Sequence, residues 1–423
     1  MTIGIDIRVL AKGTRTGIEE YVLNLLPRLL PLDKKIKYKL FYNAFRKIKL
    51  DYPWLNLPNV ELCESKIPNR ILDSCTQLFK WPKINKFLGP PKGEAGKIDI
   101  FFSPHFLPVS LPEDCKRVIT FHDLSFCHHH QFFSPSRKLW HFLTFPKSQA
   151  RKADKIITDS QSTKEDLVKI YKLNSDKIEA IYLGIGQDFK PLEINDPRFK
   201  KVTEKYGLPV SLASLRSGPA GGPGNFILYF GTIEPRKNLI SVIKAFELAK
   251  ERFLNPDLET NWRGFEGIVI GKKKGAFSDL KLVIAGARGW LYKDIFRAVK
   301  NSKYRKDIIF TGLIEDQDKP YLYNLAKAFV YPSFFEGFGF PPLEAMACGV
   351  PTIVSNASSL SEVVGDGAIM IDPYNADELA YTIKKVLDDK DLRDGLVKKG
   401  LKQAKKFDWD KTAKEVLEVF KKI

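Results

Sequence analysis

The alternation of short apolar runs with longer amphipathic stretches constrains the fold of this chain more than any other feature. Apolar runs bounded by turn-forming residues are typical of buried strands, and apolar residues at helical spacing lie between them. In the first half the strand-like runs are Ile3–Leu10, Tyr38–Tyr42, Ile98–Phe102, Arg117–Phe121, Lys155–Thr158 and Ile178–Ile181. In the second half they are Phe226–Phe230, Leu280–Ala285, Ile308–Thr311, Ala328–Tyr331, Thr352–Ser355 and Ala368–Ile371. We therefore predict an α/β fold in which helices cover parallel sheets.

Two such series in one chain of 423 residues predict two domains, because a single core rarely grows that large. The predicted parts are a Rossmann-like domain over residues 1–190, a linker or insertion over 191–225, a second Rossmann-like domain over 226–404 and a terminal helix over 405–423. Residues 211–225 are rich in Gly, Pro and Ser, and residues 255–279 resemble a further insertion. Doubly wound sheets bind ligands at the carboxyl ends of their strands, so we expect the domains to face a central cleft.

Composition excludes several classes of protein. Hydrophobic residues make up 44% of the chain and charged residues 28%, which is typical of a folded globular protein. No apolar run approaches the ~18 residues that a membrane-spanning helix needs. Asp6 and Arg8 interrupt the first apolar run, so we interpret it as a strand rather than a signal peptide. The 5 cysteines show no metal-ligand spacing, and we expect a reducing, cytoplasmic compartment.

The charge of the chain suggests an anionic partner. The sequence has 68 Lys+Arg against 50 Asp+Glu, a formal net charge of +18. Such a field attracts nucleic acid, anionic lipid or phosphorylated substrates, although a lysine-rich compositional bias explains it equally well. No arginine stripe is present, so we expect no specific nucleic-acid partner. Peripheral association with an anionic membrane, at the inner face of the plasma membrane, is a further hypothesis.

The segment YPSFFEGFGFPPLEAMACGVPTIVS, residues 331–355, is the strongest candidate for a ligand site. A strand leads into a loop with Gly337 and Gly339, and a helix is predicted to open at Pro341–Pro342. Backbone amides of such a loop and helix start form an anion site. Glu336 and Glu344 are eight positions apart, which allows one carboxylate to face the phosphates and the other to face a ribose. A surface glutamate with a helix-capping glutamate is the alternative interpretation.

A second candidate segment is YFGTIEPRKNL, residues 229–239. Here a strand ends at Phe230, Gly231 makes the turn, and Arg236 and Lys237 follow. Adjacent cations at the carboxyl end of a strand would neutralise a diphosphate. A solvated basic turn is the alternative interpretation. The presence of the first candidate segment makes us favour the diphosphate site.

These two segments together resemble the nucleotide-sugar half of retaining glycosyltransferases with the GT-B fold, specifically family 4. In EGFGFPPLEAMACGVPTIVSN, Glu336 and Glu344 match the family's E-x7-E motif. In GTIEPRKN, Lys237 matches the family's phosphate-binding lysine. Thr232 stands where many members have an arginine, and Arg236 is expected to supply that charge. The GTxEPRKN pattern looks most like GDP-mannose-dependent α-mannosyltransferases.

The first half of the chain resembles the same family. In KGTRTGIEEYVLNLL, Gly17 matches the glycine whose backbone approaches the donor phosphate, but Glu19 replaces a glycine that many relatives have. In VITFHDLSF, His122 matches the active-site histidine that faces the donor sugar, with an ordinary loop histidine as the alternative. His105 resembles a position on the acceptor side. The resemblance also implies that the terminal helix, with Trp409, crosses back to the N-terminal domain.

The predicted function is therefore that of a retaining glycosyltransferase. It moves a hexose, with mannose favoured, from GDP-mannose or a UDP-hexose to a glycan or lipid-linked acceptor in polysaccharide or glycolipid synthesis. In this interpretation Glu344 binds ribose and Glu336 lies near the sugar. Arg236 and Lys237 hold the diphosphate, together with the loop amides of residues Gly337, Phe338, Gly339 and Phe340. His122 orients the donor sugar.

We expect neither a metal nor a cofactor other than the substrate. Three D-x-D tripeptides begin at Asp316, Asp389 and Asp408, but capping and solvation explain them better than a metal-diphosphate site. The run His128–His130 is interpreted as a loop. The signatures of dehydrogenases and P-loop proteins are absent from the sequence. The rival functions are a nucleotide-sugar epimerase or a phosphorylase on the same fold, or a non-enzymatic polyanion-binding protein.

Overall fold

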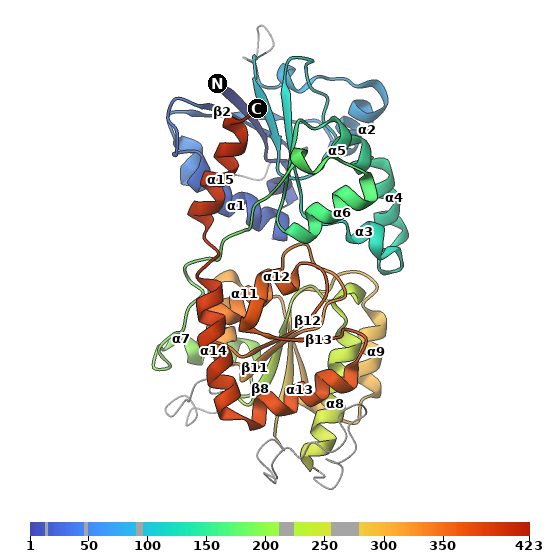
Figure 1. Cartoon of the computed structure of the whole chain (residues 1–423), viewed down its shortest axis with the longest axis vertical. Coiled ribbons are helices and arrows are strands. Elements are labelled where there is room, and N and C mark those ends of the chain that lie inside the picture. The colour runs from blue at the N-terminus through green and yellow to red at the C-terminus, as the bar shows by residue number, and fades with distance from the viewer. Residues whose placement is uncertain (13–15, 46–49, 90–95, 211–223, 255–278) are drawn as a thin grey trace. The chain divides into compact units, whose positions relative to one another are not determined.

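The structure, a computed structural model, describes residues 1–12, 16–45, 50–89, 96–210, 224–254 and 279–423. The chain divides into two compact units (Figure 1). Unit 1 comprises Met1–His128, Pro135–Gly184 and Asp408–Ile423, and unit 2 comprises His129–Ser134 and Ile185–Phe407. The insertions expected at 211–225 and 255–279 lie outside the described residues, apart from residues 224, 225 and 279.

Unit 1 is built on a seven-stranded parallel sheet with the order β3-β2-β1-β4-β5-β6-β7. Its strands are β1 (Thr2–Asp6), β2 (Lys37–Asn43), β3 (Val60–Ser65), β4 (Ile100–Ser103), β5 (Lys116–Phe121), β6 (Lys155–Thr158) and β7 (Ile178–Ala180). The chain winds outwards from β1 in both directions, so the sheet has a topological switch point between β1 and β4.

The α-helices of unit 1 are α1 (Gly17–Leu29), α2 (Asn69–Phe79), α3 (Ser125–His128), α4 (Pro135–Leu143), α5 (Pro146–Lys152), α6 (Gln161–Tyr171) and α15 (Trp409–Lys421). Helix α15 lies along α1, where the rings of Tyr21 and Trp409 are 6.2 Å apart (Figure 1). A side chain at Gly184 would place its Cβ 2.1 Å from the Trp409 backbone nitrogen, so only glycine fits beneath this helix. The end of the chain therefore completes the core of unit 1.

Unit 2 is built on a six-stranded parallel sheet with the order β10-β9-β8-β11-β12-β13. Its strands are β8 (Phe226–Phe230), β9 (Lys281–Ala285), β10 (Ile308–Gly312), β11 (Ala328–Tyr331), β12 (Thr352–Ser355) and β13 (Ile369–Ile371). The switch point lies between β8 and β11, at the centre of the sheet. The predicted class, with two doubly wound Rossmann-like domains, is confirmed.

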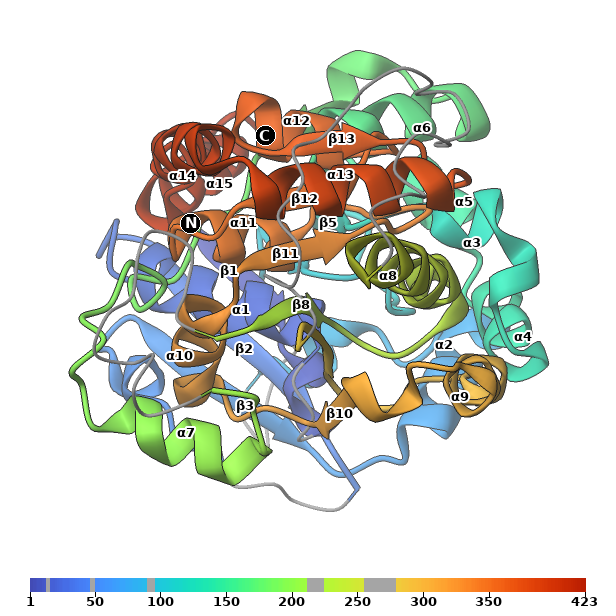
Figure 2. The ribbon, with the colours of Figure 1, turned by 90° about the horizontal axis from the view of Figure 1, so that it is seen from below.

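The α-helices of unit 2 are α7 (Arg198–Tyr206), α8 (Leu239–Leu254), α9 (Lys293–Asn301), α10 (Lys319–Leu325), α11 (Phe340–Ala347), α12 (Leu360–Val364), α13 (Ala376–Asp388) and α14 (Lys390–Ala404). Figure 2 shows α8 beside α13, and the two helices are in contact. In the part of the chain that the structure describes, no helix is both long and apolar enough to cross a membrane.

The first predicted strand, Ile3–Leu10, is too long. Strand β1 ends at Asp6, and Arg8–Lys12 form a 3-10 helix. The cause is a buried ion pair, because Arg8 Nη2 lies 2.7 Å from Asp6 Oδ2 and the Arg8 backbone N–H donates to Asp6 Oδ1 at 3.0 Å. This local pairing turns the backbone out of the sheet.

Part of the predicted linker is a helix. Within residues 191–225, the segment Arg198–Tyr206 is α7 and belongs to unit 2. Phe199 and Val202 are buried one helical turn apart, and the Phe199 ring meets Tyr321 at 5.0 Å. Two apolar residues among many lysines give too weak a periodicity to be recognised in the sequence.

Candidate active site

The two candidate segments meet at the centre of the unit 2 sheet. Strands β8 and β11 are parallel neighbours, so their carboxyl ends emerge at the same edge. The turn after β8 contains the 3-10 helix Pro235–Lys237, and the glycine-containing loop follows β11 and leads into α11. The fold therefore brings EPRKN and EGFGF together, although about a hundred residues separate them in the sequence.

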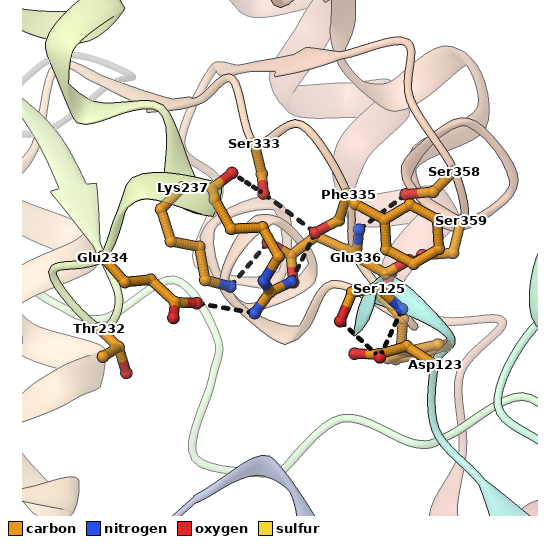
Figure 3. A network of polar contacts seen from close by, with 12 residues as sticks. Asp123, Ser125, Thr232, Glu234, Lys237, Ser333, Phe335, Glu336, Ser358 and Ser359 are labelled. Atoms are coloured by element: carbon orange, nitrogen blue, oxygen red, sulfur yellow. Dashed lines mark hydrogen bonds and ion pairs between the residues drawn. The ribbon is translucent and has the colours of Figure 1, made fainter. Parts of the chain in front are cut away.

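An ion-pair network joins these segments (Figure 3). Lys237 Nζ lies 2.6 Å from Glu336 Oε1, and Arg236 Nη1 lies 3.2 Å from Glu336 Oε2. Arg236 Nη2 lies 2.9 Å from Glu234 Oε1. Lys237, Glu336 and Glu234 are all buried. We call these four residues the Glu336 network, and in it two cations are balanced by two carboxylates.

Burial and charge act against each other in the Glu336 network. Burial raises the pKa of Glu336, but Lys237 and Arg236 outweigh it and hold the pKa at about 2. Burial lowers the pKa of Lys237, and Glu336 opposes that shift. Burial also raises the pKa of Glu234, against the effect of Arg236. Glu336 is therefore an ionised carboxylate at neutral pH.

A tyrosine hydroxyl and backbone groups fix the cations in place. Lys237 Nζ donates to the Tyr331 hydroxyl at 2.6 Å, at the end of β11. Arg236 Nη1 donates to the Phe335 carbonyl at 2.5 Å, and the Phe334 N–H donates to the Arg236 carbonyl at 2.9 Å. An ammonium has three N–H groups, so Lys237 uses two of them in contacts with Glu336 and Tyr331.

Two serines that the sequence analysis missed hold the loop around Glu336 (Figure 3). The Glu336 N–H donates to Ser358 Oγ at 2.8 Å. Ser359 Oγ lies 2.9 Å from the carbonyls of both Glu336 and Phe338 and donates there. Both serines follow β12, which pairs with β11. The sequence did contain a signal for these two serines, because hydroxyl residues stand shortly after the predicted strand that became β12.

Gly339 is the residue on which the helix start depends. It is the N-cap of α11, with φ at +113°, a region that side chains avoid. A Cβ there would lie 2.7 Å from Leu360 Cδ2. Helix α11 begins at Phe340, one residue before the predicted Pro341, and the buried Phe338 ring packs on Phe340 at 5.3 Å. Gly337 lies buried in the preceding loop.

Glu344 lies farther along α11 and has a partner of its own. The Tyr323 hydroxyl, on α10, donates to Glu344 Oε2 at 2.7 Å, and both residues are buried. Tyr323 was not predicted, because nothing in the sequence shows that α10 packs against α11.

Asn238 was also missed. It has the left-handed conformation, with φ at +58°, which asparagine tolerates better than most residues. Its Nδ2 donates to the Pro332 carbonyl at 3.0 Å and to the Pro373 carbonyl at 2.7 Å. It therefore ties the basic turn to the ends of β11 and β13.

In unit 1, His122 lies at the end of β5 and both of its ring nitrogens have partners. Nδ1 is 2.6 Å from Asp159 Oδ2, and Nε2 is 2.8 Å from the Pro104 carbonyl. Asp159 directly follows β6 and was not predicted as part of a site. The His105 ring, which follows β4, stacks on Trp140 at 5.9 Å and lies 6.0 Å from the His122 ring.

Gly17 is the first residue of α1, next to the N-cap Thr16. Glu19, which departs from the family pattern, accepts a hydrogen bond from the Thr16 N–H at 2.7 Å and completes a capping box. A Cβ at Gly17 would meet no described atom within 4 Å. The local structure of unit 1 therefore accounts for Glu19, but it gives no steric reason for glycine at position 17.

The D-x-D tripeptides have structural roles. Asp389 and Asp408 are N-caps of α14 and α15, and Asp318 pairs with Lys205 at 2.7 Å. Among the described residues, no cluster of three or more His, Cys, Asp or Glu side chains is arranged to hold a metal.

Both halves of the chain match models of known families. Residues 215–403 match the family described as Glycosyl transferases group 1, and residues 15–189 match Glycosyltransferase Family 4.

Two curated relatives are mannosyltransferases. The O-antigen chain mannosyltransferase B of Escherichia coli is 30% identical over 414 residues, which are 96% of this chain and 96% of that protein. The serotype-specific mannosyltransferase WbdA of Escherichia coli is 30% identical over 328 residues, which are 76% of this chain and 36% of that longer protein.

Solved structures share the fold. A sucrose-phosphate synthase from Thermosynechococcus elongatus has a TM-score of 0.68 at 17% identity and covers 100% of this chain and 98% of its own. Anabaena HepE, solved with UDP and glucose, has a TM-score of 0.64 at 16% identity and covers 100% of both chains. WaaG, a glycosyltransferase involved in lipopolysaccharide biosynthesis, has a TM-score of 0.65 at 14% identity over 99% of both chains.

Proposed function

Because this chain belongs to glycosyltransferase family 4, as its motifs predicted, we propose that it transfers mannose from GDP-mannose with retention of configuration. The acceptor is a hydroxyl of a cell-surface polysaccharide or of a lipid-linked precursor. The mannosyltransferase names of the 30% identical relatives support the sugar and the acceptor class. A UDP-hexose is the alternative donor, since HepE was solved with UDP and glucose.

The observation that carries the proposal is the Glu336 network at the end of β8 and β11. Its two cations lie at the switch point of a doubly wound sheet, where such folds bind ligands. Lys237 and Arg236 would hold the donor diphosphate and stabilise the negative charge that develops as it leaves. The N–H groups around Gly337, Phe338, Gly339 and Phe340, at the start of α11, would contact the same phosphates.

The contacts of Glu336 would change when the donor binds. In the structure it is paired with both cations, so a diphosphate bound there would share them. Its carboxylate would then turn to the hydroxyls of the transferred sugar. Glu344, held by Tyr323, would bind the ribose hydroxyls. The departing phosphate oxygen would accept the proton of the acceptor hydroxyl, so a same-face reaction needs no protein nucleophile.

Unit 1 would contribute three of the predicted residues. His122 would lie at the donor sugar, Gly17 at the donor phosphate and His105 on the acceptor side. No metal or further cofactor enters this scheme, because Lys237 and Arg236 supply the positive charge.

Donor binding and slow donor hydrolysis should be measured across GDP-, UDP- and ADP-sugars with excess EDTA. We expect selective binding and turnover of GDP-mannose in EDTA. Conversion of the donor to a new nucleotide sugar without acceptor would favour an epimerase instead. Failure to bind any donor, with tight salt-sensitive binding to polyanions, would favour the non-enzymatic alternative.

Peripheral association with an anionic membrane is also proposed, on the basis of helix α4. None of the nine residues Pro135–Leu143 is buried. Leu139, Phe142 and Leu143 are 57%, 69% and 45% exposed, and Lys138 and Lys147 lie nearby in the sequence. An exposed apolar surface with basic neighbours suits the boundary between lipid headgroups and acyl chains.

Flotation with phosphatidylcholine vesicles, with and without phosphatidylglycerol, tests this association. We expect recovery with the anionic vesicles only, and less of it for Phe142→Ser. Leu313→Ser is a matched control, since Leu313 is 75% exposed in unit 2. Equal recovery with both kinds of vesicle would contradict the proposal.

A further inference from the structure

Strand register in unit 1 assembles a histidine site from three neighbouring strand ends. Strands β4, β5 and β6 are adjacent and parallel, and the register pairs Phe121 with Thr158. The next residue on each strand, His122 and Asp159, therefore leaves the sheet side by side. Pro104 follows the end of β4 on the other side of β5. The fold thus places an imidazole between a carboxylate and a backbone carbonyl.

The hydrogen bonds determine where the protons of the His122 ring lie. A carbonyl oxygen only accepts, so Nε2, 2.8 Å from the Pro104 carbonyl, must donate and carry a hydrogen. Nδ1 faces Asp159 Oδ2 at 2.6 Å, a distance typical of a charge-assisted hydrogen bond. With both nitrogens engaged in this way, the ring has no lone pair with which to accept a substrate proton.

The Asp159 carboxylate contacts His122 through one of its two oxygens. It is 3% exposed, and its second oxygen, Oδ1, has no hydrogen-bond partner among the described residues. A buried carboxylate is costly unless a cation compensates its charge. Burial raises the pKa of Asp159, and His122 opposes that shift. An imidazolium at His122 lies within hydrogen-bonding distance and compensates the charge of the carboxylate.

The other groups around His122 come from several elements. The Tyr21 ring, on α1, meets the imidazole edge-on at 5.1 Å, and the His105 ring lies 6.0 Å away. Thr163, on α6, donates to the His122 carbonyl at 3.3 Å, and Asp123 is the next residue along the chain. Burial lowers the pKa of His122, but Asp159, Pro104 and Asp123 outweigh it and raise the pKa above the usual value.

We propose that Asp159 is a positioning residue, which holds His122 as an imidazolium with its Nε2–H on the Pro104 carbonyl. His122 then acts at the donor through a fixed positive charge and not as a proton acceptor. The arrangement of the pair follows from unit 1 alone, and only its role at the donor rests on the proposed function.

The first test follows the His122 ring nitrogens by NMR with ¹⁵N-labelled histidine. The chain has 6 histidines, and His122→Asn identifies the signals of interest. We expect both nitrogens to be protonated at pH 7 in the wild type. In Asp159→Asn the ring should become neutral at a pH lower by roughly 1–3 units. A wild-type ring that is neutral at pH 7, or an unchanged titration in Asp159→Asn, would overturn the proposal.

The second test is the pH profile of kcat/KM with GDP-mannose. We expect the alkaline limb of Asp159→Asn to move to lower pH by roughly 1–3 units, while a purely structural role would lower activity equally at every pH. Asp166→Asn is the matched control, because Asp166 Oδ1 pairs with His128 Nε2 at 2.9 Å in the same unit, and its profile should not move. A shift in the control as large as that in Asp159→Asn would contradict the specific role.

The two tests separate the possible failures. If Asp159→Asn does not fold, the wild-type NMR titration still decides the protonation of His122. If the wild type turns over no donor, the proposed function fails, whereas the state of the Asp159–His122 pair remains measurable.

Discussion

Lys237 is the residue on which the Glu336 network depends most, because its buried ammonium lies 2.6 Å from the buried Glu336 carboxylate. Lys237→Ala leaves that carboxylate without its nearer cation. We expect the free energy of unfolding to fall by roughly 3–5 kcal/mol. Donor turnover should fall by roughly 10²–10³, the cost of losing one charge-stabilising donor. Urea unfolding and initial rates with GDP-mannose measure the two effects.

Lys250→Ala is the control that separates stability from function. Lys250 is also buried in unit 2, and it is paired with Asp307 and the Leu280 carbonyl, just before β9 begins. This contact lies at the amino ends of the strands, whereas the Glu336 network lies at their carboxyl ends. Lys250→Ala should lose stability but keep donor affinity. Full turnover in Lys237→Ala would contradict the diphosphate assignment.

The pairing of Glu336 also predicts a pH dependence of stability. Lys237 and Arg236 overcome the effect of burial and hold the pKa of Glu336 at about 2, below its usual value of 4.5. The stabilisation is therefore complete above pH 4.5 and is lost as the pH falls towards 2. Between pH 5 and pH 3, the free energy of unfolding of the wild type should fall more steeply than that of Glu336→Gln. Parallel curves would show that Glu336 is not paired in this way.

The residues of a motif were easier to predict from the sequence than the contacts that those residues make. Arg236, Lys237, Glu336 and Glu344 were found because cations and carboxylates stood beside glycines after predicted strands. The pairing of Glu336 with Arg236 and Lys237, and that of Glu344 with Tyr323, was not predicted, because a contact between distant residues depends on strand register and helix packing. Asp159 reaches His122 only because β5 and β6 pair in one register. The roles assigned to all these residues remain proposals.

At the scale of elements, the turn into α11 sets the geometry of the loop amides. Gly339→Ala forces a side chain into φ +113° and towards Leu360. We expect a loss of roughly 1–3 kcal/mol in stability, together with weaker donor binding. Calorimetric titration with GDP and thermal unfolding measure both quantities.

Gly395→Ala is the matched control for that change. Gly395 lies inside α14, and a Cβ there would meet no described atom within 4 Å. Alanine at this position should raise stability by about 0.4–1 kcal/mol and leave GDP affinity unchanged. If both variants bound GDP like the wild type, the conformation of Gly339 would not matter to the site.

Every described strand except β3 was predicted, because each contains a short apolar run between turn signals. Strand β3 (Val60–Ser65) was missed, because Glu61 and Glu64 interrupt its apolar run. Helices with few or no buried residues were not predicted. Helix α7 has only Phe199 and Val202 buried, and α4 has no buried residue. Strand β1 also ended earlier than its apolar run, because Arg8 pairs with Asp6.

At the scale of the whole molecule, the chain returns to unit 1 through α15. Trp409 is buried there against Tyr21 of α1. Trp409→Ala should lower the free energy of unfolding by roughly 3–5 kcal/mol and reduce hydrogen-exchange protection in α1. Phe79→Ala, which removes an aromatic ring that is 73% exposed in the same unit, should change neither. Equal protection of α1 in all three proteins would mean that α15 contributes little to unit 1.

Transfer itself can be followed by ¹H NMR, with GDP-α-mannose as donor and a mannose-terminated glycan as acceptor, in the presence of EDTA. We predict one α-linked mannose added for each GDP released, and a reaction that Lys237→Ala nearly abolishes and Lys250→Ala preserves. A β-linked product would contradict retention. Conversion of the donor without acceptor, or no transfer from any nucleotide sugar, would contradict the assignment of this chain as a retaining mannosyltransferase.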